Sequence, residues 1–347
     1  MPHVALRVDS TSILPQAAEN EIIQWLSTQQ DETSGLNPLY EDPDFPSTEL
    51  SSLYIDPTKL PDYVPQQNST VYSERPAGSV YWYRPTEYTE NPDYFKSSTG
   101  CGVIREGQLN DAWLLGVFAA VALHPDNLIE NLFVSESLNA FKQFGVVTCR
   151  FYKDDQWVTV TTDTKIPYSM ELKLDDRPSG TFTPPGSVLY GGSVDKNEVF
   201  IPLLEKAYAK LHGSYQTLDE KHGGGIGGSA GTSSGRILEA FLDCTGGSAH
   251  RVDLQQERVK QLQFDQLNAG TAATSPTALL WKQMLRYKRK KCILTTQLRQ
   301  LSFNAQDVTA MGIVKNRQFK FERSSSSTCR IALCKAKDGL GPRHVER

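Results

Sequence analysis

The sequence predicts an α+β fold, because a long apolar helix, a β-hairpin and a second helix follow one another along the chain. Almost every residue from 112 to 123 is apolar, which predicts a helix buried on most sides. Residues 144–151 and 157–163 alternate in polarity around Asp154 and are rich in β-branched side chains, a pattern typical of a hairpin. Residues 203–211 place their apolar side chains on one helical face.

Composition and charge bound the class of protein. The 347 residues are enough for one large domain or two modest ones, and 39% hydrophobic and 22% charged residues are ordinary for a soluble protein. A net charge of -4 argues against general attraction to nucleic acid or to an anionic membrane. Six scattered cysteines without a CxxC pair predict reduced thiols rather than disulfides or a zinc site. No apolar run reaches membrane-spanning length, so we expect a cytoplasmic protein.

The start of the apolar helix is the most informative stretch. Asn110 and Asp111 are both suitable N-cap residues for a helix that begins near Ala112. The positive end of a helix dipole lowers the pKa of a thiol, so a cysteine protease places its nucleophile at such a position. Here that position holds a methyl group.

The run from residue 106 to residue 115 resembles the active-site signature of the calpain family, papain-like cysteine proteases with the pattern Gln-Gly-x-Leu-Gly-Asp-Cys-Trp-x-Leu. The chain keeps five positions of this pattern: Gly107, Leu109, Asp111, Trp113 and Leu115. It replaces the nucleophilic cysteine by Ala112 and the oxyanion-stabilising glutamine by Glu106. Alanine has no nucleophilic atom, and an ionised glutamate has no hydrogen to donate to an oxyanion.

The resemblance extends over roughly 170 residues and implies a papain-like protease core. Residues 80–87 are similar to the family's Trp-x-Arg-Pro-x-Glu segment, residues 197–200 to its Asn-Glu-Phe motif, and residues 243–247 also match. We therefore expect residues 80–250 to form the first protease subdomain and residues 251–347 a shortened, divergent and β-rich second subdomain. Within the latter, helices are predicted at residues 259–267 and 278–287 and a strand at residues 292–295.

The remaining catalytic positions are substituted in the same comparison. Residues 312–319 resemble the family's Gly-Leu-Val-Lys-Gly-His-Ala-Tyr, which places Arg317 where the catalytic histidine stands. Residues 331–341 place Asp338 on the catalytic asparagine. Arginine is not deprotonated in proteins and cannot act as a general base. The sequence therefore predicts no catalytic residues and no enzymatic activity.

Calcium is the cofactor that the resemblance implies. The family binds an ion with an aspartate before the active-site helix and with the glutamate of the Asn-Glu-Phe motif. Glu198 matches the glutamate, but Val103 stands at the aspartate position. Because calcium requires several oxygen ligands, we expect no cofactor and a structural role for Glu198, the vestige of a metal site.

Two segments are candidates for binding a partner. Residues 1–79 are polar and rich in proline, and predict an extended or partly disordered arm. It is either a solvated tail or an arm that docks through Tyr40, Phe45, Leu53, Tyr54 and Tyr63. The basic run at residues 286–291 is either a solvated helix end or a patch for an acidic partner. Its candidate side chains are Arg286, Lys288, Arg289, Lys290 and Lys291.

These observations predict a catalytically inactive calpain-like protein that works as a structural or binding component. The resemblance implies association with the cytoskeleton, with tubulin in the microtubules of a cilium or flagellum as the leading candidate, and with neither nucleic acid nor membrane as partner. One alternative is a regulatory pseudoprotease that competes with active calpains for their substrates. Another is a live calcium-dependent protease with an unusual or engineered active site.

Overall fold

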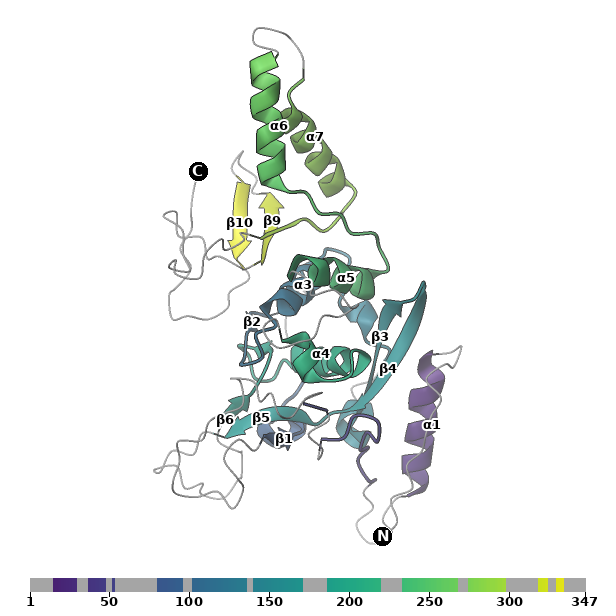
Figure 1. The fold of residues 1–347 in the computed structure, drawn as a ribbon. Helices are drawn as coiled ribbons and strands as arrows, with labels where there is room; N and C mark the ends of the chain where they lie inside the picture. Colours follow the sequence, from purple (N-terminus) through teal and green to yellow (C-terminus); the bar gives the residue numbers. More distant parts are fainter. Residues whose placement is uncertain are drawn as a thin grey trace.

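The structure, a computed structural model, combines helices and small antiparallel sheets, which confirms the predicted α+β class (Figure 1). It describes residues 15–29, 37–47, 52–53, 80–95, 102–135, 140–170, 186–219, 233–267, 274–297, 318–323 and 329–333.

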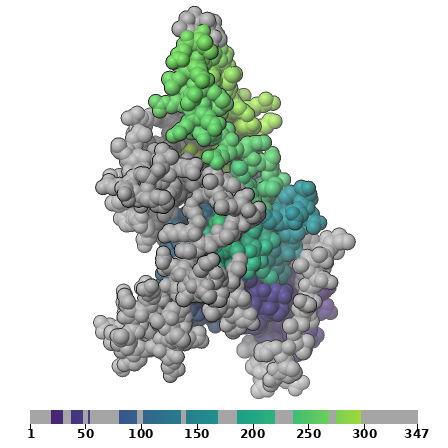
Figure 2. All heavy atoms as spheres, in the orientation of Figure 1, coloured from purple at the N-terminus to yellow at the C-terminus, as the bar shows by residue number. Residues whose placement is uncertain are grey.

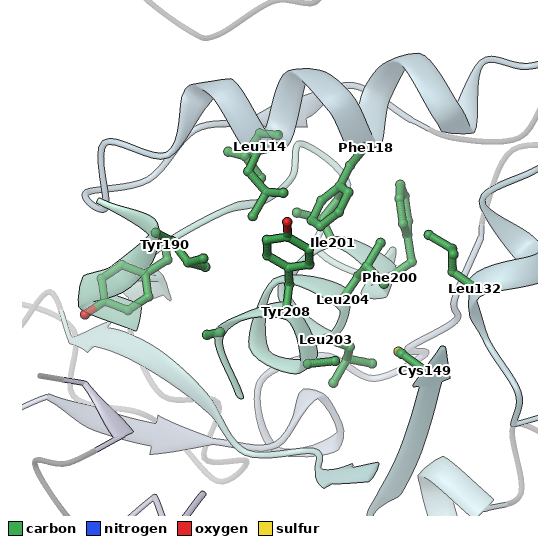
Figure 3. Packing of buried hydrophobic residues seen from close by; sticks show 14 of the residues in the cluster. Leu114, Phe118, Leu132, Cys149, Tyr190, Phe200, Ile201, Leu203, Leu204 and Tyr208 are labelled. Atoms are coloured by element: carbon green, nitrogen blue, oxygen red, sulfur yellow. The ribbon is translucent and has the colours of Figure 1, made fainter. Parts of the chain in front are cut away.

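The centre of the molecule is built around α3 (Ala112–Ala122), which packs against α5 (Ser233–Thr245). Figure 3 shows Leu114 and Phe118 of α3 lying over side chains of α4, which spans Phe200–Leu211. Both predicted helices are confirmed, but α4 begins three residues earlier than residue 203. Its third residue, Pro202, is tolerated because the first turn of a helix has no intrahelical partner for backbone N–H groups.

The predicted hairpin is also confirmed. Strand β3 (Val146–Lys153) pairs antiparallel with β4 (Gln156–Asp163) along their whole lengths. Asp154 and Asp155 form the two-residue turn with φ values of 49° and 61°. Positive φ at both central residues is characteristic of the turn that best matches strand twist, and aspartate tolerates it better than most side chains do. The hairpin lies against α4 and α5 and closes one side of the core.

Short elements complete this core. Strand β5 lies between β1 and β6 in a three-stranded antiparallel sheet, and β2 pairs with β7. The strand bounds are β1 Tyr81–Tyr83, β2 Ile104–Arg105, β5 Ile166–Met170, β6 Gly186–Val188 and β7 Gly192–Ser193. The short helices are α2 Pro85–Tyr88, η2 Glu130–Leu132, η3 Ala140–Phe144 and η4 Tyr215–Leu218.

Part of the N-terminal segment is helical, unlike the predicted extended arm, whereas residues 37–47 form no helix or strand. Helix α1 (Pro15–Thr28) packs on the β3–β4 hairpin, with Ile22 and Leu26 buried at 2% and 1% exposure. The backbone N–H of Tyr40 donates to the Phe144 carbonyl at 2.7 Å. Composition alone misses this integration, because a few apolar residues are enough to cover the outer face of a hairpin.

The C-terminal part of the chain begins with a helical pair, α6 (Leu254–Leu267) and α7 (Pro276–Arg289). Both helices are longer than predicted. The strand expected at residues 292–295 lies slightly later, as β8 (Thr295–Gln297). It forms an antiparallel sheet with β9 (Gln318–Arg323) and β10 (Cys329–Leu333), in the order β8–β9–β10. Of the helices that the structure describes, none is long and apolar enough to cross a bilayer.

Candidate functional site

The start of α3 has the geometry expected of a nucleophile position. Ala112 is the first helical residue, and the carbonyl of the N-cap residue Asp111 accepts from the backbone N–H groups of Leu114 at 2.8 Å and Leu115 at 3.2 Å. The side chain of Ala112 is half-buried. A thiol at this point would experience the positive end of the helix dipole, but a methyl group has nothing to ionise.

Asp111 occupies the N-cap position, yet its carboxyl group makes no capping hydrogen bond to the helix. It is fully buried, neither of its carboxyl oxygens has a hydrogen-bond partner among the described residues, and it interacts electrostatically with Glu205 on α4, which is 1% exposed. Asn110, the other predicted cap residue, instead adopts a left-handed backbone with φ of 54°. Tertiary packing therefore directs the aspartate inward, away from its local role in capping.

Burial controls the protonation of this carboxyl pair. Loss of solvent raises the pKa of Asp111 to about 7, and this increase is partly opposed by the interaction with Glu205 and reinforced by the charge of Glu106. Burial and the nearby Asp111 also raise the pKa of Glu205 well above its ordinary value. Because like charges in a buried site disfavour double ionisation, the pair holds a proton near neutral pH.

The loop before the helix is held close to the backbone at Tyr190. A Cβ atom placed on Gly107 would lie 2.1 Å from the Tyr190 carbonyl oxygen, and the Gln108 N–H donates to the Leu189 carbonyl at 3.0 Å. Glycine is therefore required at 107. The loop that carries the oxyanion position is tightly placed, and it presents the half-buried Glu106 there. A carboxylate at that point repels developing negative charge.

Trp113 connects the helix start to two later segments. Its indole N–H donates to the Leu218 carbonyl at 2.9 Å, and the Arg236 guanidinium lies 5.7 Å from its ring centre. Arg236 also donates to the Asp219 carbonyl at 3.0 Å. Sequence reasoning missed Arg236, because no local pattern relates a residue on α5 to one on α3.

Glu198 makes the hydrogen bonds of a structural residue. It is 2% exposed and accepts from the Gly102 N–H at 2.9 Å and from the Ser193 hydroxyl at 2.5 Å. Val103 is 52% exposed and supplies no side-chain oxygen. Within the described ranges, no three His, Cys, Asp or Glu side chains are grouped to hold a metal ion. The absence of a calcium site stays a prediction.

Tyr40, a candidate partner-binding anchor, is partly buried and also makes contacts within the fold. Its carbonyl accepts from the Arg84 guanidinium at 2.6 Å, and its ring packs with a small apolar cluster that includes Leu26 and Phe144. Burial raises the pKa of its hydroxyl. A role for Tyr40 in binding a partner stays a prediction. Phe45 and Leu53 are each 2% exposed within the main apolar core, so the expectation that they serve as anchors is wrong.

The basic run lies at the C-terminal end of α7. Lys291 pairs with Asp126 at 2.5 Å, and its carbonyl oxygen lies 2.6 Å from His124 Nε2. His124 is 8% exposed and lies just beyond the C-terminal end of α3, at the opposite end of the helix from Ala112. The other cationic side chains of the run are solvent-exposed: Arg286, Lys288, Arg289 and Lys290.

Four predicted residues lie outside the described residues: Tyr54, Tyr63, Arg317 and Asp338. Strand β9 begins at the residue directly after position 317, and it contacts α3. Helix α3 and strand β9 are therefore neighbours in space, although some two hundred residues separate them in the sequence.

Comparison with known proteins agrees with this architecture. The family described as calpain family cysteine protease matches residues 40–335, a span that begins within the predicted N-terminal arm. Calpain-A of Drosophila melanogaster is 30% identical over 250 residues, which are 72% of this chain and 26% of that protein. Calpain-9 of Rattus norvegicus is 31% identical over 218 residues, 63% of this chain and 25% of the relative.

The Calpain-2 catalytic subunit of Bos taurus is 28% identical over 227 residues, 65% of this chain and 26% of its own length. The matched region thus spans about a quarter of the length of these three relatives.

Proposed function

The chain belongs to the calpain family of cysteine proteases, and we propose that it is a member that binds other proteins without cleaving them. The observation that carries the proposal is Ala112: a methyl group stands at the first residue of a helix whose start is otherwise suited to a thiolate. No side chain at that point can attack a carbonyl carbon.

Two further substitutions support the loss of catalysis. Glu106 replaces the family's oxyanion donor with an acceptor, and Arg317 stands at the base position with a group that stays protonated. A single change at the nucleophile is what an experimenter would introduce. Three changes with three different chemical consequences favour a natural loss of activity.

The fold around these positions argues for a retained shape. Gly107 still makes the close approach to the Tyr190 backbone, and Trp113 still donates from within the core. Such contacts keep the shape of the protein around the helix start, although the residues that would carry out catalysis are substituted. We therefore assign the chain a structural or binding role and place it, by proposal, in the cytoplasm with the cytoskeleton of a cilium or flagellum.

The activity test uses the purified chain with casein and with a fluorogenic calpain peptide, with and without millimolar calcium. We expect no turnover and no labelling by an epoxide inhibitor of thiol proteases. An active calpain in a parallel tube shows that the assay works. Turnover that persists through repurification from a second expression host would establish the live protease and end the proposal.

The regulatory alternative is favoured by one observation, the preserved placement of the loop at Gly107 next to the helix start. A pseudoprotease that keeps this surface could compete for substrates. Adding the purified chain in excess to an active calpain tests this: a binding or structural component leaves casein cleavage unchanged, whereas a competitor slows it in proportion to its concentration.

The cytoskeletal assignment is tested by detergent extraction of cells that express the tagged chain. We expect the protein to stay with the insoluble cytoskeleton and a variant with Arg286→Glu and Arg289→Glu to move toward the soluble fraction. These side chains are exposed, so the change leaves the core intact. Deleting residues 1–79 is a poor test, because it would also remove the buried Leu26. A wholly soluble, diffuse full-length protein would contradict the assignment.

A further inference from the structure

We propose that one exposed face of α7, formed by Leu279, Lys282, Arg286 and Arg289, binds an acidic amphipathic segment of a partner protein. The inference rests on the proposed binding function and specifies the chemistry of the partner. It goes beyond the basic run at the helix end, because it selects two cations of that run and adds two residues from the preceding turns.

Helical spacing brings these four side chains together. They follow one another at intervals of three, four and three residues, so they form a row along one face of α7. All four are exposed, and Leu279 is 55% exposed. By contrast, Leu280, Met284 and Tyr287 repeat on a different face of the helix and are partly buried. The row is therefore the solvent side of the helix.

The row is positively charged, and the adjoining sequence supplies no acidic residue to balance it. Residues 275–297 contain six lysines and arginines and no acidic residue. In the part of the chain that the structure describes, Lys291 has Asp126 as its counter-charge, whereas no carboxylate pairs with Lys282, Arg286 or Arg289. Like charges four residues apart destabilise a helix, so a bound acidic segment would relieve the repulsion between Lys282 and Arg286.

The helix is anchored at both ends. At its start, the Ser275 hydroxyl accepts from the Ala278 N–H at 3.3 Å, and the Gln261 side chain of α6 accepts from the Thr277 N–H at 3.0 Å. Beyond its end, Lys291 contacts His124 and Asp126 next to α3. Between these anchors the α6–α7 pair protrudes from the rest of the molecule (Figures 1 and 2). Because the helix backbone is already formed, the loss of backbone freedom on binding is small, and the main entropic cost is the ordering of the exposed side chains.

The chemistry of the row favours a protein over a nucleic acid or a membrane. A half-exposed leucine continues the line of cations, and arginine beside an apolar side chain is typical of protein interfaces. The net charge of -4 opposes the broad attraction that phosphate backbones and anionic lipids require. Lys282 and Arg289 are seven residues apart, about 10 Å along the axis, which matches acidic side chains spaced over two turns of a partner helix.

The test measures fluorescence anisotropy of a labelled helical peptide that carries three glutamates at intervals of four and three residues and one leucine in line with them. The full chain is titrated into this peptide and into a copy with glutamine in place of glutamate. We expect binding to the glutamate peptide only. Arg286→Glu should weaken it by about tenfold or more, because charge reversal turns an attraction into a repulsion.

Lys288→Glu is the matched control: it makes the same charge change on the same helix but outside the row. It should weaken binding by less than about twofold, since exposed charges off the interface act only through screened attraction. Equal weakening by both variants would show general attraction and overturn the proposed face, as would no binding to the glutamate peptide. Circular dichroism of each variant verifies that the fold is retained.

Two further probes decide the class of partner. A single-stranded DNA oligonucleotide and vesicles of phosphatidylserine and phosphatidylcholine are titrated under the same salt conditions. Tighter binding to either one than to the glutamate peptide would overturn the assignment to a protein. The outcome is independent of the protease assays. Proteolysis would refute the proposed inactivity but would not affect the proposed binding face. Failed peptide binding would refute the binding face and leave the proposed inactivity standing.

Discussion

Asp111 at the start of α3 and Glu205 on α4 are both buried carboxyl groups, and burial together with the charge of Asp111 raises the pKa of Glu205. Because like charges in a buried site disfavour double ionisation, the pair retains a proton near neutral pH. Glu205 also accepts from the Gly191 N–H at 3.0 Å, which orients one of its oxygens. The start of α3 is therefore coupled to the titration of a buried carboxyl pair.

This pair predicts a pH-dependent stability. Burial and the charge of Asp111 raise the pKa of Glu205 well above its ordinary value, so Glu205 holds a proton in the folded state that the unfolded chain has already lost above about pH 5. Relative to Glu205→Gln, which lacks this proton but keeps Asp111, the wild-type free energy of unfolding should fall as the pH rises above about 5, by up to about 1.4 kcal/mol per pH unit. Urea denaturation at intervals across this range measures the difference. Glu130→Gln, at an exposed glutamate, is the control; identical pH profiles for both variants would refute the coupling.

Restoring the nucleophile alone should not restore proteolysis. The Ala112→Cys variant gains a thiol at the helix start, but Glu106 and Arg317 still leave it without an oxyanion donor and a base. Members of a catalytic set are strongly non-additive. Casein cleavage and epoxide labelling are measured beside the triple variant that also carries Glu106→Gln and Arg317→His. Full calcium-dependent activity from the single change would mean that the alignment of Arg317 is wrong.

Calcium should leave the stability unchanged. A ligand that binds only the folded state raises the midpoint of thermal unfolding by mass action. Glu198 is already occupied by the Gly102 N–H and the Ser193 hydroxyl, and Val103 adds no ligand. Differential scanning fluorimetry with millimolar calcium, and with magnesium at the same concentration, checks the expectation. A rise specific to calcium would reveal a site that the family motif does not describe.

Gly107→Ala should destabilise the protein by roughly 1–3 kcal/mol, the range typical of overpacking. Its new Cβ would lie 2.1 Å from the Tyr190 carbonyl oxygen, so backbone on one side or the other has to shift. Gly192→Ala is a matched control, because its Cβ would meet only the Val188 side chain at 3.8 Å. Urea midpoints of the two variants are compared, and a similar loss for both would show that the close approach at Gly107 is not specific.

Leu26→Ala tests whether the N-terminal helix belongs to the folded core. Its side chain is 1% exposed in the cluster between α1 and the hairpin, so truncation should cost about 2–5 kcal/mol of unfolding free energy. Leu39→Ala removes the same atoms from a side chain that is 43% exposed, and its cost should be small. If the two variants unfold at the same urea concentration, α1 is a separate arm after all.

The local sequence pattern was sufficient to predict the helices and strands whose apolar residues are arranged most regularly. The apolar run of α3, the Asp154–Asp155 hairpin and the amphipathic face of α4 all follow from residue type and spacing, because burial and turn geometry act on neighbours in sequence. The absence of a nucleophile at position 112 is also a property of the sequence, since no arrangement in space adds a reactive atom to alanine.

Only the tertiary structure decided the partners of these elements. Asp111 has the local character of a helix cap, but packing of α3 on α4 brings it to Glu205 and changes its role. Tyr40 and Leu26 belong to a segment whose composition suggests an arm, and they are held by residues more than a hundred positions away, on the hairpin and η3. Contacts of this kind depend on surfaces that exist only after the chain has folded. They could not be predicted because burial between segments that are distant in sequence produces no periodic pattern in either segment.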